Sequence, residues 1–427
     1  MKSRRDNNKM TIILITLIIF TLMFSIFSIL YYHRLWNPIL LCTTMLLLGI
    51  ILAFDNCSPK DMEVAMFWIL IGETFLLSSF FIMQIFFNKR TTKEEVSNIT
   101  YNLSILKKLI SVNIVVSILG LLVNTYSVMQ IAPSFRDIFV NSTYVRCLYL
   151  QRSSGAFITI LGLLLTLNFF VTFIYFPIAL QNGIKRTVPK LIFVLAIRLS
   201  SSLITMSKQA FLIDIIYFVS AYMIIIKSKK EEFNFYKKYG VVFGFLIVLL
   251  LVVISFQRNY IGGGRYAGYG DAIIGTLRTY ISVSIEAFGK LLNLKSITFT
   301  DGSLCFRPIF NILSYLGVGT RVFVIQDALT NIVNANVYTA FGNMYRDFSF
   351  VGIIILSTVF GGFLGAIYNT KHKYKSSHIV INSIIIMTMF FIYYDLIIIQ
   401  TIYVFVMVYA VIVDKIIANK LYIEEMI

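Results

Sequence analysis

Charged residues are scarce in this chain, and their scarcity argues against an ordinary soluble protein. Of the 427 residues, 13% are charged and 58% are hydrophobic, whereas about a quarter of a soluble domain is charged. The hydrophobic residues come in long blocks rather than in amphipathic periods. Most of the net charge of +17 lies in short loops between the blocks. That pattern is typical of cytoplasmic loops in membrane proteins and argues against nucleic acid as a partner.

Cysteine and histidine are also few, which argues against two kinds of site. The four cysteines are Cys42, Cys57, Cys147 and Cys305, and none forms a CxxC pair. We therefore expect no disulfide framework and no metal cluster. The three histidines match no zinc-binding spacing either. The sequence predicts no metal site.

Apolar blocks of about 20 residues predict membrane-spanning helices. We expect about eleven, in a range of about 10–14, at residues 10–30, 38–54, 64–87, 109–130, 157–180, 190–206, 209–226, 239–256, 349–369, 378–394 and 396–413. The block at 349–369 contains Gly352, Gly361, Gly362 and Gly365, which predict close packing against another helix. Residues 257–348 have mixed polarity and form one large insert between two blocks. The sequence thus predicts an all-α integral membrane protein, with residues 1–427 as a single polytopic domain and short amphipathic or re-entrant helices in the insert.

Basic residues predict the orientation of these helices. They concentrate in five segments, at residues 88–108, 185–190, 227–238, 371–375 and 415–420. The number of blocks between these segments allows all five to lie on one side, and basic loops favour the cytoplasm. We therefore expect a cytoplasmic C-terminus and an insert 257–348 on the outer side of the membrane.

Polar residues inside the apolar blocks are costly and point to buried pairs or functional groups. Arg198 and Asp214 lie at similar depths on either side of the turn near Ser207, about 10–13 Å from the outer surface at 1.5 Å per residue. We expect them to form an ion pair, either as a structural bridge or with Arg198 lining a polar cavity. In the second case the serines at 200–202 would add hydroxyl groups to the cavity wall. Asn113, Asn124 and Asn168 are more typical of hydrogen bonds between helices than of ligand binding.

The insert contains an amphipathic helix with one polar stripe. Residues 271–292 read DAIIGTLRTYISVSIEAFGKLL. At 100° per residue the stripe contains Asp271, Gly275, Arg278, Ser282, Glu286 and Gly289. Such a helix either lies flat at the membrane interface or turns the stripe toward a cavity, where Arg278 would bind an anion.

Arginine is frequent in the segments predicted to lie outside, against the usual charge bias of membrane proteins. These arginines are Arg136, Arg146, Arg152, Arg258, Arg265, Arg278, Arg307, Arg321 and Arg346. A guanidinium group binds phosphate through two parallel hydrogen bonds and keeps its charge. The pattern indicates an anionic ligand at the outer leaflet, such as a lipid pyrophosphate.

Three pieces of the chain resemble the bacterial oligosaccharide repeat-unit polymerases, which include O-antigen and capsular polysaccharide polymerases. The first is the hairpin 198–222, with Lys208 at the outer turn where many relatives have arginine. The second is QRNYIGGGRYAGYGDAIIGTLRTYISVSIEAF, residues 257–288, and the third is TAFGNMYRDFSFVGIIILSTVFGGFLGAIY, residues 339–368. The resemblance covers roughly residues 190–413, and the N-terminal part is similar only in topology.

The resemblance implies an inverting, metal-independent glycosyltransferase of the membrane GT-C type in the bacterial cytoplasmic membrane, without a cofactor. It would pass a growing glycan from undecaprenyl pyrophosphate to the next lipid-linked repeat unit, with a chain-length regulator and a flippase as partner proteins. The implied pyrophosphate-binding residues are Arg258, Arg265, Arg278, Arg346, Lys208 and Tyr280. Glu286 or Asp347 would be the general base, although Asp347 can instead orient Arg346 through an ion pair.

Two other activities fit part of the pattern. An O-antigen ligase-like enzyme shares the architecture and donor, but such ligases often use a histidine in the outer segment, and residues 257–348 contain none. A flippase of lipid-linked oligosaccharide usually has two related halves and no late insert. The insert and the lack of visible halves favour a polymerase.

Overall fold

Helices make up nearly all of the fold. The computed structural model describes residues 2–54, 57–90, 99–132, 134, 145, 149, 156–205, 207–226, 230–241, 244–245, 248–249, 269–294, 297–322, 338–368 and 375–424. For residues 2–10, 88–90, 99, 156, 208, 269–280 and 423–424 it describes the backbone. Two compact units form: Met1–Glu94 with Leu277–Asn369 and Ile384–Val404, called unit 1, and Glu95–Thr276 with Thr370–Ser383 and Phe405–Ile427, called unit 2.

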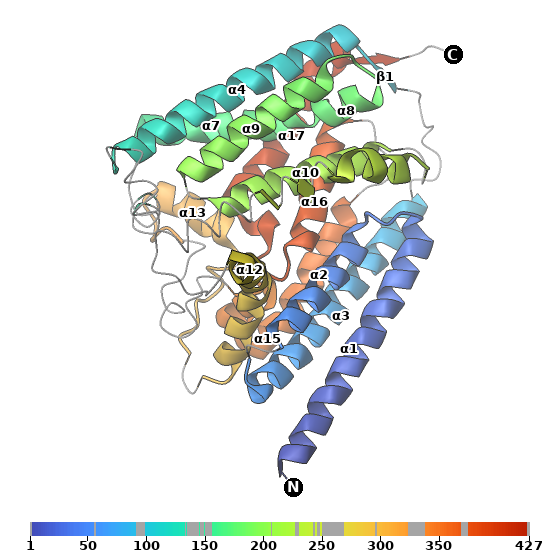
Figure 1. Ribbon diagram of the computed structural model, residues 1–427, viewed down its shortest axis with the longest axis vertical. Coiled ribbons are helices and arrows are strands. Elements are labelled where there is room, and N and C mark those ends of the chain that lie inside the picture. The colour runs from blue at the N-terminus through green and yellow to red at the C-terminus, as the bar shows by residue number, and fades with distance from the viewer. Residues whose placement is uncertain are drawn as a thin grey trace. The chain divides into compact units, whose positions relative to one another are not determined.

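The first unit is built on the N-terminal helices and on those that follow the insert (Figure 1). It contains α1 (Lys2–Tyr32), α2 (Pro38–Ala53), α3 (Pro59–Arg90), most of α12 (Tyr269–Leu292), α13 (Arg307–Tyr315), α15 (Ala340–Ile367) and the 3-10 turn η2 (Ile397–Ile399). Side-chain caps fix where several helices begin: the Asn37 side chain accepts from the Leu40 N–H at 2.9 Å, and Thr339 accepts from the Gly342 N–H at 3.1 Å.

The second unit contains the middle helices and the C-terminal end. It holds β1 (Ile99–Tyr101), α4 (Leu103–Met129), α7 (Ala156–Phe173), α8 (Tyr175–Gln181), α9 (Thr187–Ile204), α10 (Lys208–Ile225) and β2 (Tyr422–Glu424). Helices α16 (Ser376–Phe390) and α17 (Thr401–Leu421) contribute residues to both units. The α4 helix packs against α7 and α9.

Seven helices of the described residues are long and apolar enough to cross a membrane: Thr11–Tyr32, Pro59–Phe87, Leu103–Met129, Phe157–Gln181, Thr187–Ile204, Ala340–Ile367 and Thr401–Leu421. Three shorter apolar helices cover Pro38–Ala53, Gln209–Ile225 and Ser376–Phe390. These helices coincide with every predicted block except 239–256, which lies largely outside the described residues. The all-α membrane class is therefore supported, with helix ends that differ from the prediction.

Two of the differences in helix ends have local causes. Helix α15 begins at Ala340 instead of residue 349, because Thr339 caps it, and it is kinked at Phe348 and Ser349, where the backbone leaves the helical region. The last helix begins at Thr401 instead of residue 396, because the chain first turns through η2. The amphipathic helix predicted at 271–292 is present as α12.

Close packing of α3 on α15 forms the core of unit 1. A Cβ atom added to Gly361 would collide with the Leu76 carbonyl oxygen, and one added to Gly365 would collide with that of Phe80. The Gln84 amide also donates hydrogen bonds to the Gly365 and Tyr368 carbonyls. Small residues four positions apart therefore let the two backbones touch, as the glycines of residues 349–369 predict.

Hydrogen bonds between helices lock the core of unit 2. The Asn113 amide of α4 donates to the Phe169 carbonyl of α7 at 3.1 Å and to the Thr172 hydroxyl at 2.9 Å. The Asn168 side chain accepts from the Tyr409 hydroxyl of α17 at 2.9 Å. The interhelical role predicted for these two asparagines is confirmed, with Asn168 as acceptor.

Candidate functional site

The ion pair predicted inside the hairpin α9–α10 is present in unit 2. Arg198 Nε donates to Asp214 Oδ2 at 2.7 Å, and Nη2 donates to Oδ1 at 3.1 Å. The guanidinium carbon also lies 4.1 Å from the centre of the Phe169 ring. Asp214 is 1% exposed and Arg198 is 19% exposed. The aspartate therefore holds the arginine from the buried side and leaves part of the guanidinium accessible.

That accessible part faces a small polar cavity of about 150 Å³. The cavity is lined by Asn124, Tyr149, Arg198, Ser201, Ser202, Thr205, Ser207 and Ala210. The Asn124 amide donates to the Ser201 hydroxyl at 2.7 Å, and Thr205 donates to the Ser201 carbonyl at 2.9 Å. The wall thus combines one cation with hydroxyl and amide groups, which suits an anion or a hydroxyl-rich ligand.

Two of the three serines predicted to line this wall do so. Ser201 and Ser202 line the cavity, and the Ser202 hydroxyl donates to the Ser207 carbonyl, which ties the end of α9 to the start of α10. Ser200 is exposed, and its hydroxyl donates to the Ala196 carbonyl of its own helix at 3.0 Å. Lys208 is the first residue of α10, next to Ser207, and its side chain lies outside the described part of the chain.

The described parts of the basic segments lie at one end of unit 2. Strand β1, before α4, pairs with β2, and the Asn102 N–H donates to the Leu421 carbonyl, so the start of α4 lies beside the C-terminal segment. The Ser376 N–H donates to the Tyr422 hydroxyl at 2.7 Å, which brings the start of α16 to the same place. The Gln181 amide donates to Glu231 at 3.1 Å and joins the two remaining basic segments. Lys107 and Lys108 belong to the first three segments, and Lys190 belongs to the last two. Because all three lysines line one groove, all of these segments lie at the same end of unit 2.

The Arg198 cavity lies toward the opposite end of unit 2. Asn124 is 17 residues beyond Lys107 on the same helix, which corresponds to roughly 25 Å along the axis. Ser207 and Thr205 follow the C-terminal end of α9, whereas Lys190 lies in its first turn. The cavity and the basic end are therefore separated by most of a membrane thickness.

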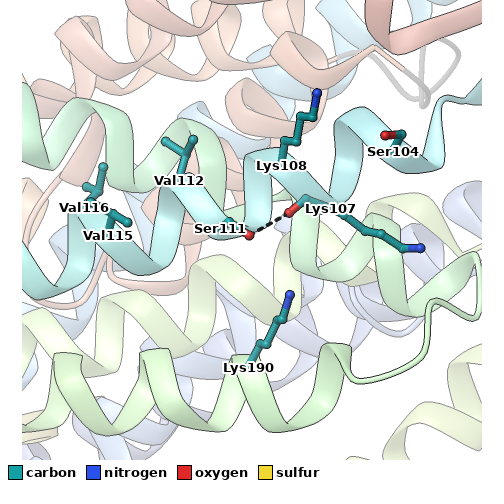
Figure 2. A pocket seen from close by; sticks show the side chains of 8 residues that line it. All are labelled: Ser104, Lys107, Lys108, Ser111, Val112, Val115, Val116 and Lys190. Carbon is teal, nitrogen blue, oxygen red and sulfur yellow. Dashed lines mark hydrogen bonds between the residues drawn. The ribbon is translucent and has the colours of Figure 1, made fainter.

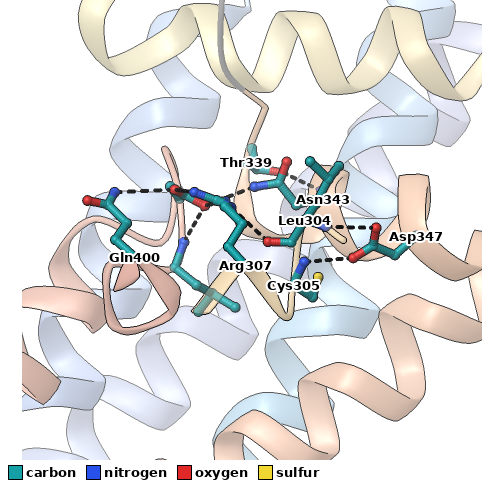
Figure 3. Close-up of polar contacts among 10 residues, drawn as sticks. Leu304, Cys305, Arg307, Thr339, Asn343, Asp347 and Gln400 are labelled. Carbon is teal, nitrogen blue, oxygen red and sulfur yellow. Dashed lines mark hydrogen bonds and ion pairs between the residues drawn. The ribbon is translucent and has the colours of Figure 1, made fainter. Parts of the chain in front are cut away.

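A second polar cluster is buried in unit 1 and includes Arg307, Asn343 and Gln400 (Figure 3). It is centred on Asp395, just before η2. Arg307 Nη1 and Nη2 donate to the two Asp395 oxygens at 2.9 and 2.8 Å. The Asn343 amide donates to Asp395 at 2.9 Å, and Gln400 donates at 3.3 Å. Burial lowers the pKa of Arg307, but the adjacent Asp395 outweighs it and holds that pKa above its ordinary value.

Asp347 is enclosed beside this cluster, contrary to what a general base requires. Its carboxylate accepts from the Thr300 hydroxyl at 2.6 Å. Figure 3 shows that it also accepts from the Leu304 and Cys305 N–H groups, at 3.2 and 2.7 Å. The residue is 2% exposed. Its oxygens are occupied by donors of the segment before α13. This arrangement favours a structural role for Asp347, not proton transfer.

The Arg346 side chain lies near Tyr338 and does not pair with Asp347. Its guanidinium carbon lies 5.7 Å from the centre of the Tyr338 ring, and its carbonyl accepts from the Thr300 N–H at 3.0 Å. Between these two described residues, Arg346 and Asp347, no ion pair forms, so the orienting role considered for Asp347 is not observed. Burial raises the pKa of Tyr338 to about 12, partly offset by Arg346.

Glu286 is the accessible carboxylate of the predicted pair. It lies on α12, and its side chain is 15% exposed and accepts from Lys290 at 2.8 Å. Burial, followed by the charges of Glu286 and Asp61, raises the pKa of Cys57 to about 12. Gly289, three residues beyond Glu286, packs against the backbone of Asp61 near the start of α3. Asp61 in turn accepts from the Asn293 amide at 2.6 Å. Glu286 thus lies in a polar group with a lysine and an aspartate.

The polar stripe of α12 does not face one cavity along its length. Ser282 is 1% exposed, and a Cβ atom added to Gly289 would lie 2.6 Å from the Asp61 carbonyl oxygen. Both stripe residues therefore pack inside unit 1, whereas Glu286 stays accessible. The part of the stripe that would bind an anion is the turn holding Arg278 and Tyr280, whose side chains lie outside the described residues. Arg258 and Arg265 also lie outside them.

Sequence reasoning missed the Arg307–Asp395 pair because 88 residues separate the two. The available signal was Asp395 itself, a carboxylate between two apolar blocks, which needs a buried partner. As for metals, no group of three or more His, Cys, Asp or Glu residues in the described ranges is placed to hold an ion.

Comparisons of the chain with protein-family models, with curated proteins and with solved structures found no match. The functional proposal therefore rests on the residues and their geometry.

Proposed function

We propose that the chain is a membrane glycosyltransferase that joins oligosaccharide repeat units carried on undecaprenyl pyrophosphate. The observation that carries the proposal is the Arg198 cavity, which lies toward the end of unit 2 opposite the basic segments. If those segments are cytoplasmic, as their charge favours, the cavity lies toward the outer leaflet. That leaflet is where lipid-linked repeat units would be joined into O-antigen, capsular polysaccharide or exopolysaccharide.

The proposed chemistry is one displacement at the anomeric carbon. The acceptor sugar hydroxyl attacks that carbon, its proton passes to a carboxylate, and the bond to the lipid pyrophosphate breaks. Arginines stabilise the departing pyrophosphate because they supply paired donors and a fixed charge. We assign this role to Arg258, Arg278 and Arg346, with Arg265, Lys208 and Tyr280 as further ligands.

Glu286 is the better of the two candidate bases. It is accessible, and its lysine partner lies on the same helix one turn away, a pair that contributes little to stability. Asp347 has no comparable access, because its oxygens accept three hydrogen bonds inside unit 1. We therefore propose Glu286 as general base and Asp347 as the group that positions the segment before α13 and, through the adjacent backbone, Arg346.

The two alternatives predict different products. A ligase-like enzyme would move finished glycan to another acceptor, and a flippase would move lipid-linked oligosaccharide across the membrane without making a bond. The arginine-rich insert supports a transferase, since a flippase needs no leaving-group stabilisation. The absence of histidine from residues 257–348 supports a polymerase over a ligase.

The test is the length distribution of surface polysaccharide in cells that lack the gene, read on a gel. The polymerase proposal predicts that the ladder collapses to single repeat units and that a plasmid copy restores it. Loss of all surface glycan would instead indicate export. Normal polymer that is no longer attached to its acceptor would indicate a ligase.

A further inference from the structure

The groove between α4 and α9 in unit 2 has a basic end and an apolar wall (Figure 2). Its volume is about 540 Å³. Lys107 and Lys108 of α4 and Lys190 of α9 line the basic end, and Figure 2 shows Lys190 extending from α9 toward α4. No acidic residue is among the eight that line the groove. The charge of this end is therefore left to be balanced by a ligand.

The apolar wall continues from the lysines along α4. Val112 and Val115 are 43% and 54% exposed, and they line the groove together with Val116. Val115 lies eight residues beyond Lys107, or about 12 Å along the helix axis. Both helices are candidate membrane spans with their lysines in the first two turns. The cations thus lie near the membrane surface and the valines at the depth of lipid tails.

We propose that this groove binds one anionic phospholipid of the surrounding bilayer. Its phosphate lies between Lys107 and Lys190, with Lys108 adding to the positive potential, and one acyl chain lies along the valine wall. The complementarity of charge at one end and of apolar surface at the other supports a lipid over a soluble anion. Basic pockets between membrane helices near the cytoplasmic surface are suited to such headgroups. This site is separate from the Arg198 cavity and does not depend on the glycosyltransferase proposal.

The lipid would have a structural consequence for unit 2. It would bridge α4 and α9, the two helices that contribute Asn124 and Arg198 to the cavity at their other ends. Neutralising the lysines would also remove the mutual repulsion of three cations that share one groove. We therefore expect the bound lipid to raise the melting temperature of the protein.

The test is native mass spectrometry of the full-length chain in neutral detergent, titrated with phosphatidylglycerol or phosphatidylcholine of the same acyl chains. The variant is Lys107→Gln/Lys190→Gln, and the matched control is Lys415→Gln/Lys420→Gln. The control removes the same charge from two exposed lysines of α17, outside the groove and at the same basic end. Because all four side chains are at least partly exposed, we expect both variants to fold, which their melting curves will show.

We expect the wild-type chain to retain phosphatidylglycerol in preference to phosphatidylcholine. The groove variant should lose roughly 25-fold in affinity for phosphatidylglycerol, since each of its two lysines near the surface contributes about fivefold. The control should bind as the wild type does. Equal losses in the two variants would overturn the proposal in favour of diffuse attraction. Displacement of the lipid by millimolar inorganic phosphate would overturn it in favour of a soluble anion.

Discussion

The two carboxylates proposed as general bases, Glu286 and Asp347, have different surroundings. Asp347 is enclosed by three donors, whereas Glu286 has one exposed partner. We predict that Asp347→Asn lowers the free energy of unfolding by about 2–4 kcal/mol. The NH₂ group of the new amide would face an O–H or N–H donor where the carboxylate oxygen now accepts a hydrogen bond. Glu286→Gln should leave the melting temperature nearly unchanged and slow glycan transfer about 10²–10⁴-fold, as for loss of a general base.

Thermal unfolding in detergent and the polysaccharide ladder of complemented cells measure the two effects separately. Lys290→Gln is the control for Glu286→Gln, since it breaks the same ion pair and keeps the carboxylate. A stable, inactive Asp347→Asn would return the role of base to Asp347. A fully active Glu286→Gln would remove that role from Glu286.

The Arg307–Asp395 pair is a second test at the residue scale. Both side chains are at most 2% exposed, so removing one leaves a buried charge without its partner. We predict that Arg307→Met destabilises the protein by about 3–5 kcal/mol. The double variant Arg307→Met/Asp395→Asn should recover part of that loss, because it also removes the stranded carboxylate. If the losses from the two single variants simply add in the double variant, the two residues are not coupled.

The sequence alone predicts one of the two buried ion pairs and not the other. Arg198 and Asp214 could be paired because the hairpin turn near Ser207 sets both at one depth, and helix rise is a fixed quantity. Arg307 and Asp395 could not, because the chain between them includes several helices whose packing cannot be deduced from local periodicity. Asp347 was recognised as important, but its enclosure depends on the fold of residues 300–305, which has no sequence signature.

At the scale of elements, the α3–α15 contact depends on glycine. We predict that Gly361→Ala destabilises the protein by about 1–3 kcal/mol, because the added methyl group collides with the Leu76 carbonyl and pushes the helices apart. Gly362→Ala is the matched control one residue on, where the nearest atom, Met83 Cγ, is 3.7 Å away. Melting temperatures of the two variants in one detergent provide the comparison. Equal shifts would show that the close approach at Gly361 is not required.

The apolar blocks of the sequence predicted nearly all of the described membrane helices, but they predicted the helix ends less accurately. The glycines of residues 349–369 indicated close packing, although the partner, α3, is distant in the chain and could not be identified. The helix starts at Ala340 and Thr401 were missed, because a side-chain cap and a 3-10 turn act within a few residues. The polar stripe of α12 was predicted to form a single face, whereas tertiary packing buries Ser282 and Gly289 and leaves Glu286 accessible.

At the scale of the whole molecule, contacts within unit 2 place the described parts of the basic segments at one end, and we propose from their charge that this end is cytoplasmic. We predict that a membrane-impermeant maleimide fails to label Lys237→Cys and Lys420→Cys in intact cells and labels both in inverted vesicles. Thr320→Cys, in the insert predicted to lie outside, should show the reverse. All three positions are exposed, and the background chain needs its native cysteines replaced. Labelling of the two lysine positions from opposite sides would contradict the arrangement.

The central claim is that this chain by itself forms the bond between repeat units. The most direct measurement incubates the purified protein in liposomes with lipid-linked repeat units. These are extracted from cells that lack the gene, because such cells would accumulate the repeat units that the protein normally joins. The account predicts a ladder of lengthened, lipid-linked glycans from the wild-type chain and single units from Glu286→Gln. Repeat units that stay single with a folded wild-type protein, or that only change leaflet, would contradict it.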